Sequence, residues 1–299
     1  MQFAQRKRKR SFRTYYTCLI LLFIFLAIVM VFPLYNVFVT SFAPQSEILM
    51  TPLMLWPKRA TLNNYRYLVM DGGIVSAYAV TIFTTVVGTA LSMFFTLLLA
   101  YGLSKRELPG GHIIHRILLV SMFIDSGLIP FYLMVKNLGL MNSVWSSIIP
   151  CLVSLWNYLV IRSFFLQLPQ ELEEAAMIDG ASYGMLFVRI VVPLSLPVIA
   201  TFTLYYAVGY WNSWYYCMLF TNDNKLQLLQ LYVYRFVQQA GLEYNTTAAA
   251  YRNRTGEMVM NLEGIKAACC IAAVAPILLV YPFLQKYFAK GIMLGAIKG

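Results

Sequence analysis

The feature that most constrains this chain is a series of long apolar stretches without charged side chains. The first runs from Thr14 to Ser46, with its most apolar part at Cys18 to Val39. A helix needs about 20 apolar residues to cross the hydrocarbon layer, where unpaired backbone groups are costly. We expect an uncleaved membrane-spanning helix here, because the stretch is too long for a signal sequence and contains no Ala-x-Ala site.

Further apolar stretches meet the same criterion. Hydrophobic residues make up 60% of the chain and charged residues 12%, against roughly half and a quarter in soluble globular proteins. The predicted fold class is therefore an all-α polytopic membrane protein with six transmembrane helices. The five additional spans are expected at Ser76–Leu103, Ile113–Val135 (interrupted by Asp125, Gly127 and Pro130), Val144–Phe165, Ile190–Asn222 and Ala267–Leu284.

Basic residues indicate the orientation of the chain. The cluster Arg6–Arg10 lies just before the first apolar stretch. Lys and Arg are enriched in cytoplasmic segments, so an even number of spans would place both termini in the cytoplasm. This orientation also accounts for the net charge of +11 without a nucleic-acid partner, since no basic face alternates with aromatic residues that could stack on bases.

The same layout predicts how the chain is divided. We expect a basic cytoplasmic N-terminus (1–13), a first transmembrane helix (14–40), an outer loop (41–75), a core of five transmembrane helices (76–290) and a cytoplasmic tail (291–299). The core would contain a second long outer loop at 221–266. Loops of this length are often functional or disordered, so a partner on the outer face is the alternative to a plain connection.

Few residues could carry chemistry of their own. The five cysteines lie in apolar stretches without a CxxC pair, and two histidines cannot supply a zinc site. A GxxxxGK[ST] phosphate-binding motif is missing from the sequence. We therefore expect no catalytic residue, metal or cofactor on this chain.

The segment between the fourth and fifth predicted spans has a distinctive composition. Glutamates in its first turns suit the positive end of the helix dipole, and Pro169 suits the first helical position. Gly180 can adopt a positive φ and end the helix, and a second short helix is expected over 182–190. Small side chains there would let another protein approach closely, although a membrane-surface or packing helix is the alternative. The relevant residues are Pro169, Glu171, Glu173, Glu174, Ala175, Ala176 and Gly180.

This segment resembles a known signature. Glu174-Ala175-Ala176, followed by Gly180, Ile190 and Val192-Pro193 at fixed spacing, is similar to the EAA motif of binding-protein-dependent ABC importer permeases. Val192 stands where that motif usually has leucine. Other segments resemble the carbohydrate-uptake branch, in particular the second permease of maltose-type and complex-oligosaccharide importers: 62–65, 100–105, 127–130, 211–214 and 290–299.

The resemblance implies a type I ABC importer permease fold in the cell (inner) membrane. Such a permease would translocate an oligosaccharide by alternating access. Its partners would be a second homologous permease, two ATPase subunits that bind ATP and Mg²⁺, and an extracytoplasmic sugar-binding protein that contacts the outer loop. The coupling segment (168–190) would dock on an ATPase subunit, and the residues assigned to this role are Glu171, Glu174, Ala175, Ala176, Asp179, Gly180, Ile190 and Pro193.

The predicted substrate path lies in the fifth and neighbouring spans. Tyr206, Tyr210 and Asn212 repeat at about helical spacing, and rings with a polar edge can stack on sugars while bonding their hydroxyls. Trp214–Tyr216 would suit either this path or an aromatic belt at the outer interface. Asp125, the carboxylate inside a span, would face a cavity or pair with a neighbouring chain. Asn157 would contact substrate or hold helices together.

Two other classes of function are alternatives for an apolar chain of this kind. An ion-coupled secondary sugar transporter needs ion sites near the midplane and commonly shows internal repeats, whereas this chain offers only Asp125. A membrane-embedded transferase needs clustered carboxylates or a metal site. The glutamates at 171, 173 and 174 lack a nearby His or Asp partner for a metal.

Overall fold

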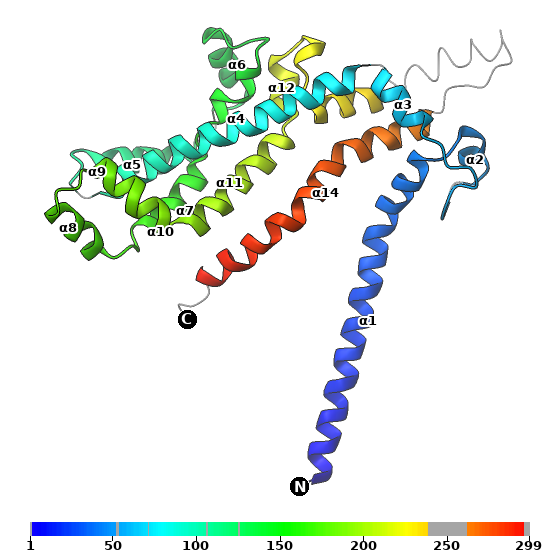
Figure 1. Ribbon diagram of the computed structural model, residues 1–299, viewed down its shortest axis with the longest axis horizontal. Helices are drawn as coiled ribbons and strands as arrows, with labels where there is room; N and C mark the ends of the chain where they lie inside the picture. Colours follow the sequence, from blue (N-terminus) through cyan, green and yellow to red (C-terminus); the bar gives the residue numbers. More distant parts are fainter. Residues whose placement is uncertain are drawn as a thin grey trace. The chain divides into compact units, whose positions relative to one another are not determined.

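The computed structural model describes residues 2–51, 54–70, 72–105, 107–124, 126–238 and 262–295. All regular elements in these ranges are helices, which confirms the predicted all-α class (Figure 1). Contacts divide the chain into two compact units. Unit 1 comprises Met1–Met70 and Phe236–Val274, and unit 2 comprises Asp71–Arg235 and Ala275–Gly299.

Unit 1 is built around the first long helix and the segment that follows it. Its elements are α1 (Gln2–Ser41), α2 (Gln45–Met50), α3 (Asn63–Met70) and the first part of α14 (Leu262–Gly295). The amide of Asn64 donates to the carbonyl of Ser41 at 2.8 Å, and the hydroxyls of Ser41 and Tyr65 are 2.7 Å apart. The predicted outer loop 41–75 therefore contains two short helices, one of which is tied to the end of α1.

The phenol of Tyr65 stays neutral in this position. Burial raises the pKa of Tyr65 above its ordinary value of 10, and the hydrogen bond with Ser41 partly opposes this shift. Both the ordinary and the raised pKa lie above physiological pH, so the phenol keeps its proton. The hydrogen bond between Ser41 of α1 and Tyr65 of α3 is therefore retained at physiological pH.

Unit 2 holds the elements that form the candidate sites. They are α4 (Gly73–Gly102), α5 (Gly111–Ser121), α6 (Leu128–Asn137), the 3-10 turns η1 (Val144–Ser147) and η2 (Ile149–Cys151), α7 (Leu155–Phe165), α8 (Gln170–Ile178), α9 (Tyr183–Leu186), the π-helical turn η3 (Phe187–Val191), α10 (Val192–Leu194), α11 (Leu196–Trp211), α12 (Tyr215–Phe220) and η4 (Asn224–Leu226).

The described part of the chain contains three helices that are long and apolar enough to cross a bilayer. These are Tyr15–Ser41, Gly73–Gly102 and Leu262–Val280. Two bent pairs raise the number to five if each pair counts as one span: Val144–Cys151 with Leu155–Phe165, and Tyr183–Leu194 with Leu196–Trp211. The third predicted span, Ile113–Val135, is divided between α5 and α6.

The fourth and fifth predicted spans are not continuous helices as their charge-free runs suggested. Val144–Phe165 bends by 45° after η2, where Pro150 lies and where Ser154 starts α7 by accepting from the backbone of Asn157. The run Ile190–Asn222 bends by 84° at Ser195, and α11 ends at Trp211. A run without charged residues can lie in the membrane, but its composition does not determine whether the helix is straight. Here the bends are set by prolines and by residues that cap new helices.

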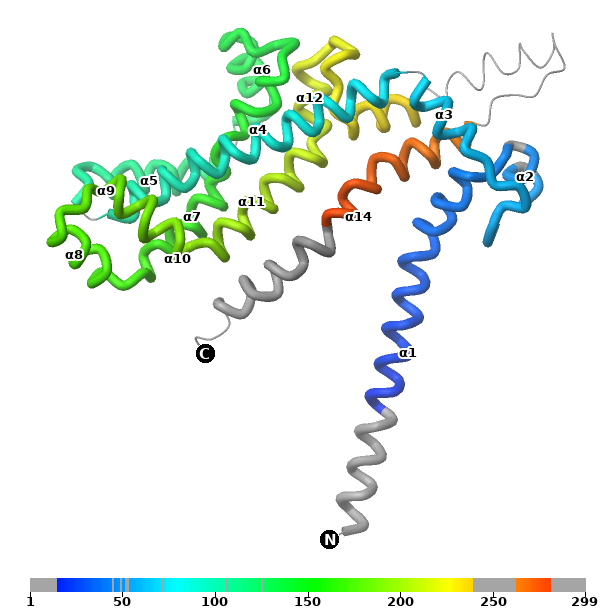
Figure 2. Tube along the Cα trace, in the orientation of Figure 1, coloured from blue at the N-terminus to red at the C-terminus, as the bar shows by residue number. Residues whose placement is uncertain are grey.

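Polar contacts fix how α4 packs against α11, and Figure 2 shows the two helices running beside each other. Ser92 Oγ lies 2.8 Å from the Tyr210 hydroxyl, and Thr96 Oγ1 lies 2.8 Å from the Tyr206 hydroxyl. All four side chains are buried. Sliding of either helix would leave these hydroxyls unpaired in an apolar interior, so the register of the pair is strongly specified.

The close approach of the two helices yields a first prediction, for Gly88→Ala. A Cβ at Gly88 would lie 2.8 Å from atoms of the Tyr210 ring, which is buried and held by Ser92. Overpacking of this kind costs about 1–3 kcal/mol. We expect a lower thermal unfolding midpoint of the purified protein in detergent.

Gly102→Ala on the same helix is the matched control, because a Cβ there meets no atom within 4 Å. An equal loss of stability in both variants would contradict the packing explanation.

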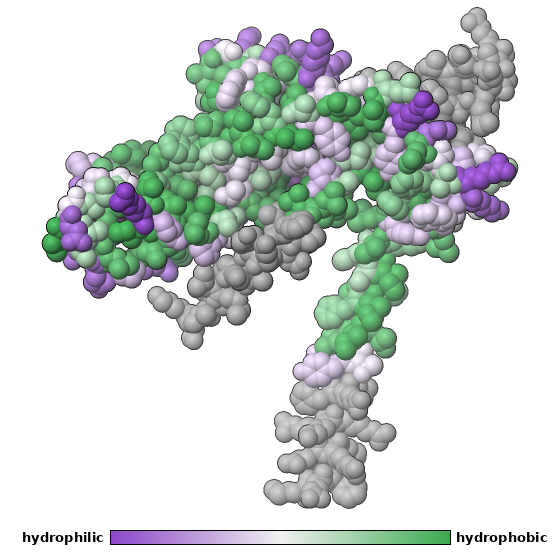
Figure 3. Space-filling model, viewed as in Figure 1, coloured by the Kyte–Doolittle hydropathy of each residue, from purple (hydrophilic) through white to green (hydrophobic). Residues whose placement is uncertain are grey.

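The surface of the molecule separates apolar from polar regions. Hydrophobic residues cover the coloured part of α1 and much of α4, while hydrophilic residues gather in several places, including the end where α8 and α9 lie and the region of α6 (Figure 3). Exposed apolar side chains on a long helix are typical of contact with lipid or with another membrane-embedded chain. The α8–α9 end is thus one of the parts of unit 2 suited to water.

Candidate functional site

The coupling segment forms the helix that the sequence predicts. Helix α8 runs from Gln170 to Ile178, with Glu171 and Glu173 in its first turn. Pro169 occupies the cap position, one residue earlier than expected, with φ of −59°. Its fixed φ and the negative charges that follow it account for a helix start at this point.

Gly180 ends α8 in the way its sequence position indicated. Its φ is +80°, and the backbone N–H of Gly180 donates to Met177 O at 3.0 Å. The next N–H, of Ala181, donates to Ala176 O at 2.9 Å. This pair of bonds is a Schellman motif, which needs a residue in the left-handed region where glycine carries no steric penalty.

Most of the predicted docking residues on α8 are open to solvent. Glu171, Glu174, Ala175, Asp179 and Gly180 are exposed, whereas Ala176 is half-buried. The structure therefore brings together a small, acidic surface of side chains on one short helix and its terminal turn.

The remaining predicted docking residues lie in the helix that follows. Ser182 caps α9 by accepting from the N–H of Met185, and the helix continues through η3 to Leu194. It therefore extends beyond the predicted end at 190. Ile190 is half-buried within the π-helical turn, and Pro193 is exposed in α10. Pro193 has no N–H to donate, which interrupts the regular α-helical ladder here.

Two features of this region were not predicted. The side chain of Ile178, at the C-terminal end of α8, is 86% exposed, an unusual setting for a large apolar residue beside acidic ones. Glu173 turns away from the exposed face and forms an ion pair with Lys105, which follows α4. Helical spacing gave a signal for the first of these, since 174 and 178 share a face. Predicting the ion pair between Glu173 and Lys105 requires knowing where α4 ends.

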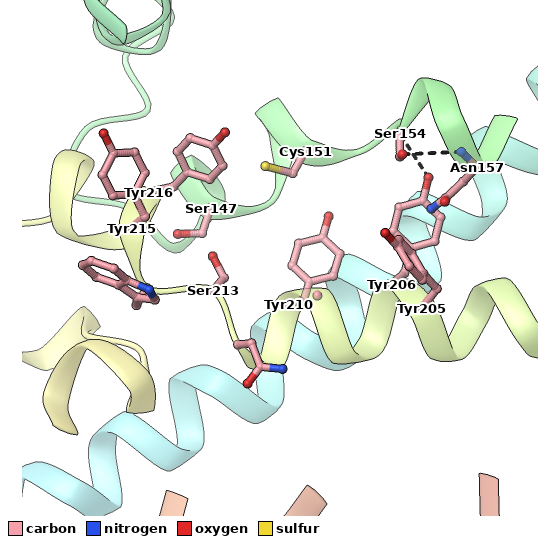
Figure 4. A pocket seen from close by; sticks show the side chains of 13 residues that line it. Ser147, Cys151, Ser154, Asn157, Tyr205, Tyr206, Tyr210, Ser213, Tyr215 and Tyr216 are labelled. Carbon is pink, nitrogen blue, oxygen red and sulfur yellow. Dashed lines mark hydrogen bonds between the residues drawn. The ribbon is translucent and has the colours of Figure 1, made fainter. Parts of the chain in front are cut away.

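A second candidate site is a pocket of about 370 Å³ in unit 2 (Figure 4). Aromatic, hydroxyl and amide side chains line it, and the described residues of the wall include no charged group. They come from the η1–α7 stretch and from the end of α11, the following turn and the start of α12: Ser147, Cys151, Ser154, Asn157, Tyr205, Tyr206, Gly209, Tyr210, Asn212, Ser213, Trp214, Tyr215 and Tyr216.

Tyr206 and Tyr210 lie at this wall, but their hydroxyls are engaged inside the protein. Besides its contact with Thr96, the Tyr206 hydroxyl accepts from the backbone N–H of Ser154 at 3.0 Å. Tyr210 is similarly held by Ser92. Both residues are at least nine-tenths buried. Their rings can therefore shape the pocket, while their hydroxyls serve helix packing.

Asn157 differs from the other polar residues of the wall. Its side chain is fully buried, and within the described chain neither Oδ1 nor Nδ2 has a hydrogen-bond partner. A buried carboxamide without partners costs about 1–3 kcal/mol. Figure 4 shows it beside Ser154 and Tyr206 at one end of the pocket. Such a group is available to a ligand that brings both a donor and an acceptor.

The other predicted path residues have different settings. Asn212 is exposed and donates to Val208 O at 3.0 Å, just after the end of α11. Asp125 lies outside the described residues. Tyr205, which is 60% exposed, and Trp214–Tyr216 line the pocket, and Trp214 stacks on Tyr234 with ring centroids 4.9 Å apart.

Of the pocket wall that comes from the η1–α7 stretch, the sequence predicted only Asn157 as a path residue. Ser147, Cys151 and Ser154 recur with helical spacing within an otherwise apolar run, and Asn157 continues the series. That periodicity is a signal for a polar face. Recognising it as one wall of a pocket requires the bend before α7.

Known proteins match this chain over nearly its full length. Residues 2–294 match the family described as binding-protein-dependent transport system inner membrane component. Protein LplC of Bacillus subtilis is 40% identical, with 96% of each chain covered. The polygalacturonan/rhamnogalacturonan transport system permease protein YtcP of the same organism is 38% identical, with 91% of this chain and 94% of YtcP covered.

A solved structure supports the fold independently of these relatives. A bacterial ABC transporter involved in the import of the acidic polysaccharide alginate matches with a TM-score of 0.85 and 27% identity. The match covers 93% of this chain and 98% of that one, and it confirms the predicted ABC importer permease fold. The chain belongs to the family of inner-membrane components of binding-protein-dependent ABC transport systems.

Proposed function

We propose that this chain is the permease subunit of an oligosaccharide importer and that its coupling segment docks on an ATPase subunit. The observation that carries the proposal is the exposed α8 surface of Glu171, Glu174 and Ala175, which ends at the Gly180 turn. Small side chains allow a partner to approach the backbone closely, and the carboxylates can pair with basic groups on it. The exposed Ile178 adds an apolar contact at the end of the same helix.

The complete transporter would contain this chain, a second homologous permease, two ATPase subunits and an extracytoplasmic sugar-binding protein. ATP and Mg²⁺ would be bound by the ATPase subunits. The cluster Arg6–Arg10 favours cytoplasmic termini, which puts α8 on the side where an ATPase works. The outer loop 221–266 would contact the binding protein. Residues 239–261 of that loop lie outside the described ranges.

An oligosaccharide is the substrate class that fits the pocket. Exposed aromatic rings such as Tyr205 and Trp214 can stack on sugar rings, and serine hydroxyls and amides can bond sugar hydroxyls. The names of YtcP and of the alginate transporter refer to polysaccharides, which supports the same class. Because the described wall is uncharged, we propose that this subunit recognises rings and hydroxyls rather than carboxylates.

Cysteine cross-linking tests the docking. In the assembled complex, Ala175→Cys and Ile178→Cys, each labelled with a benzophenone maleimide, should form a photo-cross-link to the ATPase subunit, because the benzophenone inserts into nearby C–H bonds and needs no second thiol. Asn137→Cys, at the exposed end of α6, is the control and should form none. If neither α8 position cross-links while the ATPase subunit is present in the complex, the docking role is wrong.

The substrate class is tested separately, through the soluble receptor that co-purifies with the complex. Its thermal unfolding is measured with oligogalacturonates and with neutral oligosaccharides of the same length. A shift with any oligosaccharide supports the proposal, and the comparison of the two sets identifies the charge of the substrate. A receptor that responds only to amino acids or ions would contradict it.

A further inference from the structure

The end of α4 makes a dense set of contacts with the coupling segment. Lys105 forms an ion pair with Glu173 of α8, and both side chains are largely shielded, with 15% and 19% of their surfaces exposed. The Lys105 ammonium also lies 4.5 Å from the centre of the Tyr101 ring, in cation–π geometry. A shielded pair of this kind is screened less by salt than a surface pair, and removal of one partner leaves a charge uncompensated.

Tyr101 extends these contacts to the second part of the coupling segment. It is buried at 8% exposure, its ring lies 4.9 Å from that of Phe187, and its hydroxyl donates to Tyr183 O at 3.4 Å. Helix α7 is attached to the same point, because Arg162 Nε donates to Leu103 O at 2.8 Å. The last turn of α4 is therefore held by α7, α8 and α9 together.

The other contacts of α4 lead to the pocket. Ser92 and Thr96 bond the hydroxyls of Tyr210 and Tyr206, whose rings form part of the pocket wall. A displacement of α4 along its axis or about it would carry these two tyrosines with it, because a slip would break buried hydrogen bonds. Continuous contacts thus run from Glu173 through Lys105 and α4 to the pocket.

We propose that Lys105 and Glu173 are positioning residues that fix α8 to the end of α4, so that movement of the coupling segment is transmitted to the pocket wall. The inference rests on the proposed docking of α8. Glu173 differs from Glu171 and Glu174 in its setting: it pairs with Lys105 within the permease, whereas they are exposed to solvent. Breaking the pair lets α8 move without α4, while the docking surface stays intact.

The test uses Cys151, a native thiol in the pocket wall, as the reporter. The complete complex of two permeases and two ATPases is placed in nanodiscs. The rate of Cys151 labelling by a water-soluble maleimide is then measured by peptide mass spectrometry, with and without a non-hydrolysable ATP analogue. In the wild type we expect the analogue to change this rate. Ser213→Cys provides a second reporter in the same pocket.

Glu173→Gln and Lys105→Met are expected to lose this nucleotide-dependent change while still retaining the ATPase subunits and binding the analogue. Glu107→Gln, a carboxylate change at an exposed residue near Lys105, is the control that should keep it. Lys105→Arg, which preserves the charge, should retain most of the response. Retention of the ATPase subunits by Lys105→Met shows that its loss of response does not come from misfolding.

Four results would overturn the inference. An unaltered response in Glu173→Gln would show that the ion pair transmits nothing. Loss of the ATPase subunits from Glu173→Gln would assign Glu173 to the docking surface and leave the proposed function standing. A wild-type complex whose pocket labelling ignores the nucleotide would remove this inference and leave the proposed function standing. A wild-type complex that holds no ATPase subunit would remove both.

Discussion

Replacing Gly180 with valine is expected to lower ATP-driven uptake and binding-protein-stimulated ATP hydrolysis by about 5- to 30-fold. The residue has a φ of +80°, a conformation that costs about 1–2 kcal/mol for a residue with a Cβ. A Cβ at Gly180 would meet no atom within 4 Å, so the effect arises from the backbone and not from a clash. The turn after α8 would open and the docking surface would lose its orientation. The measurement is stimulated ATPase activity of the reconstituted transporter.

Two further variants separate this explanation from general destabilisation. Gly110→Val places the same strain at φ of +75°, also in open space, but outside the coupling segment. It should leave stimulated hydrolysis close to the wild-type value. Gly180→Asn should retain much of the activity, because asparagine tolerates the left-handed region. Normal stimulated turnover in Gly180→Val would show that Gly180 is a passive loop residue.

Replacing Asn157 with leucine is expected to reduce uptake by about 5- to 150-fold while the protein becomes no less stable. The carboxamide is buried without a hydrogen-bond partner in the described chain, so an apolar side chain of similar size removes a cost of about 1–3 kcal/mol. Without the carboxamide, the substrate would lose hydrogen bonds that are also worth about 1–3 kcal/mol. A loss of this size corresponds to the expected decrease in uptake of about 5- to 150-fold. Uptake by proteoliposomes and the unfolding midpoint in detergent are measured on the same preparations.

Thr84→Val is the matched control for Asn157→Leu. The Thr84 hydroxyl is also buried and without a partner in the described chain, but it does not line the pocket. This variant should be stable and should transport normally. If Asn157→Leu behaves in the same way, Asn157 serves packing, and the substrate path must use other groups.

Local signals in the sequence were sufficient for where the helices of the coupling segment begin and for the turn between them, although the second helix runs beyond its predicted end at 190. The glutamates, Gly180 and Ser182 each act within one or two helical turns, and the structure places a helix, a Schellman turn and a capped second helix where they indicate. Long charge-free runs likewise predicted where apolar helices occur. Both kinds of inference depend on residues close together in the chain, which is why they succeed.

Long-range contacts are the part that the sequence could not supply. Tyr206 and Tyr210 have helical spacing, which suggested a shared face, but their pairing with Thr96 and Ser92 joins residues more than 100 positions apart. Nothing local shows that their hydroxyls are used for packing. The same holds for the Lys105–Glu173 pair, and for the pocket wall that forms only because α7 bends away from η2.

Helix α1 has a consequence for assembly. Over its most apolar window, no residue is buried within the described chain. In lipid such a helix satisfies all its own backbone groups and needs no tertiary neighbour to persist. Helix α1 can therefore insert into the membrane before its tertiary contacts form. A newly made subunit can then remain in the membrane before the other subunits bind to it. Detergents that replace the surrounding lipid poorly should affect this helix before they affect the bundle of unit 2.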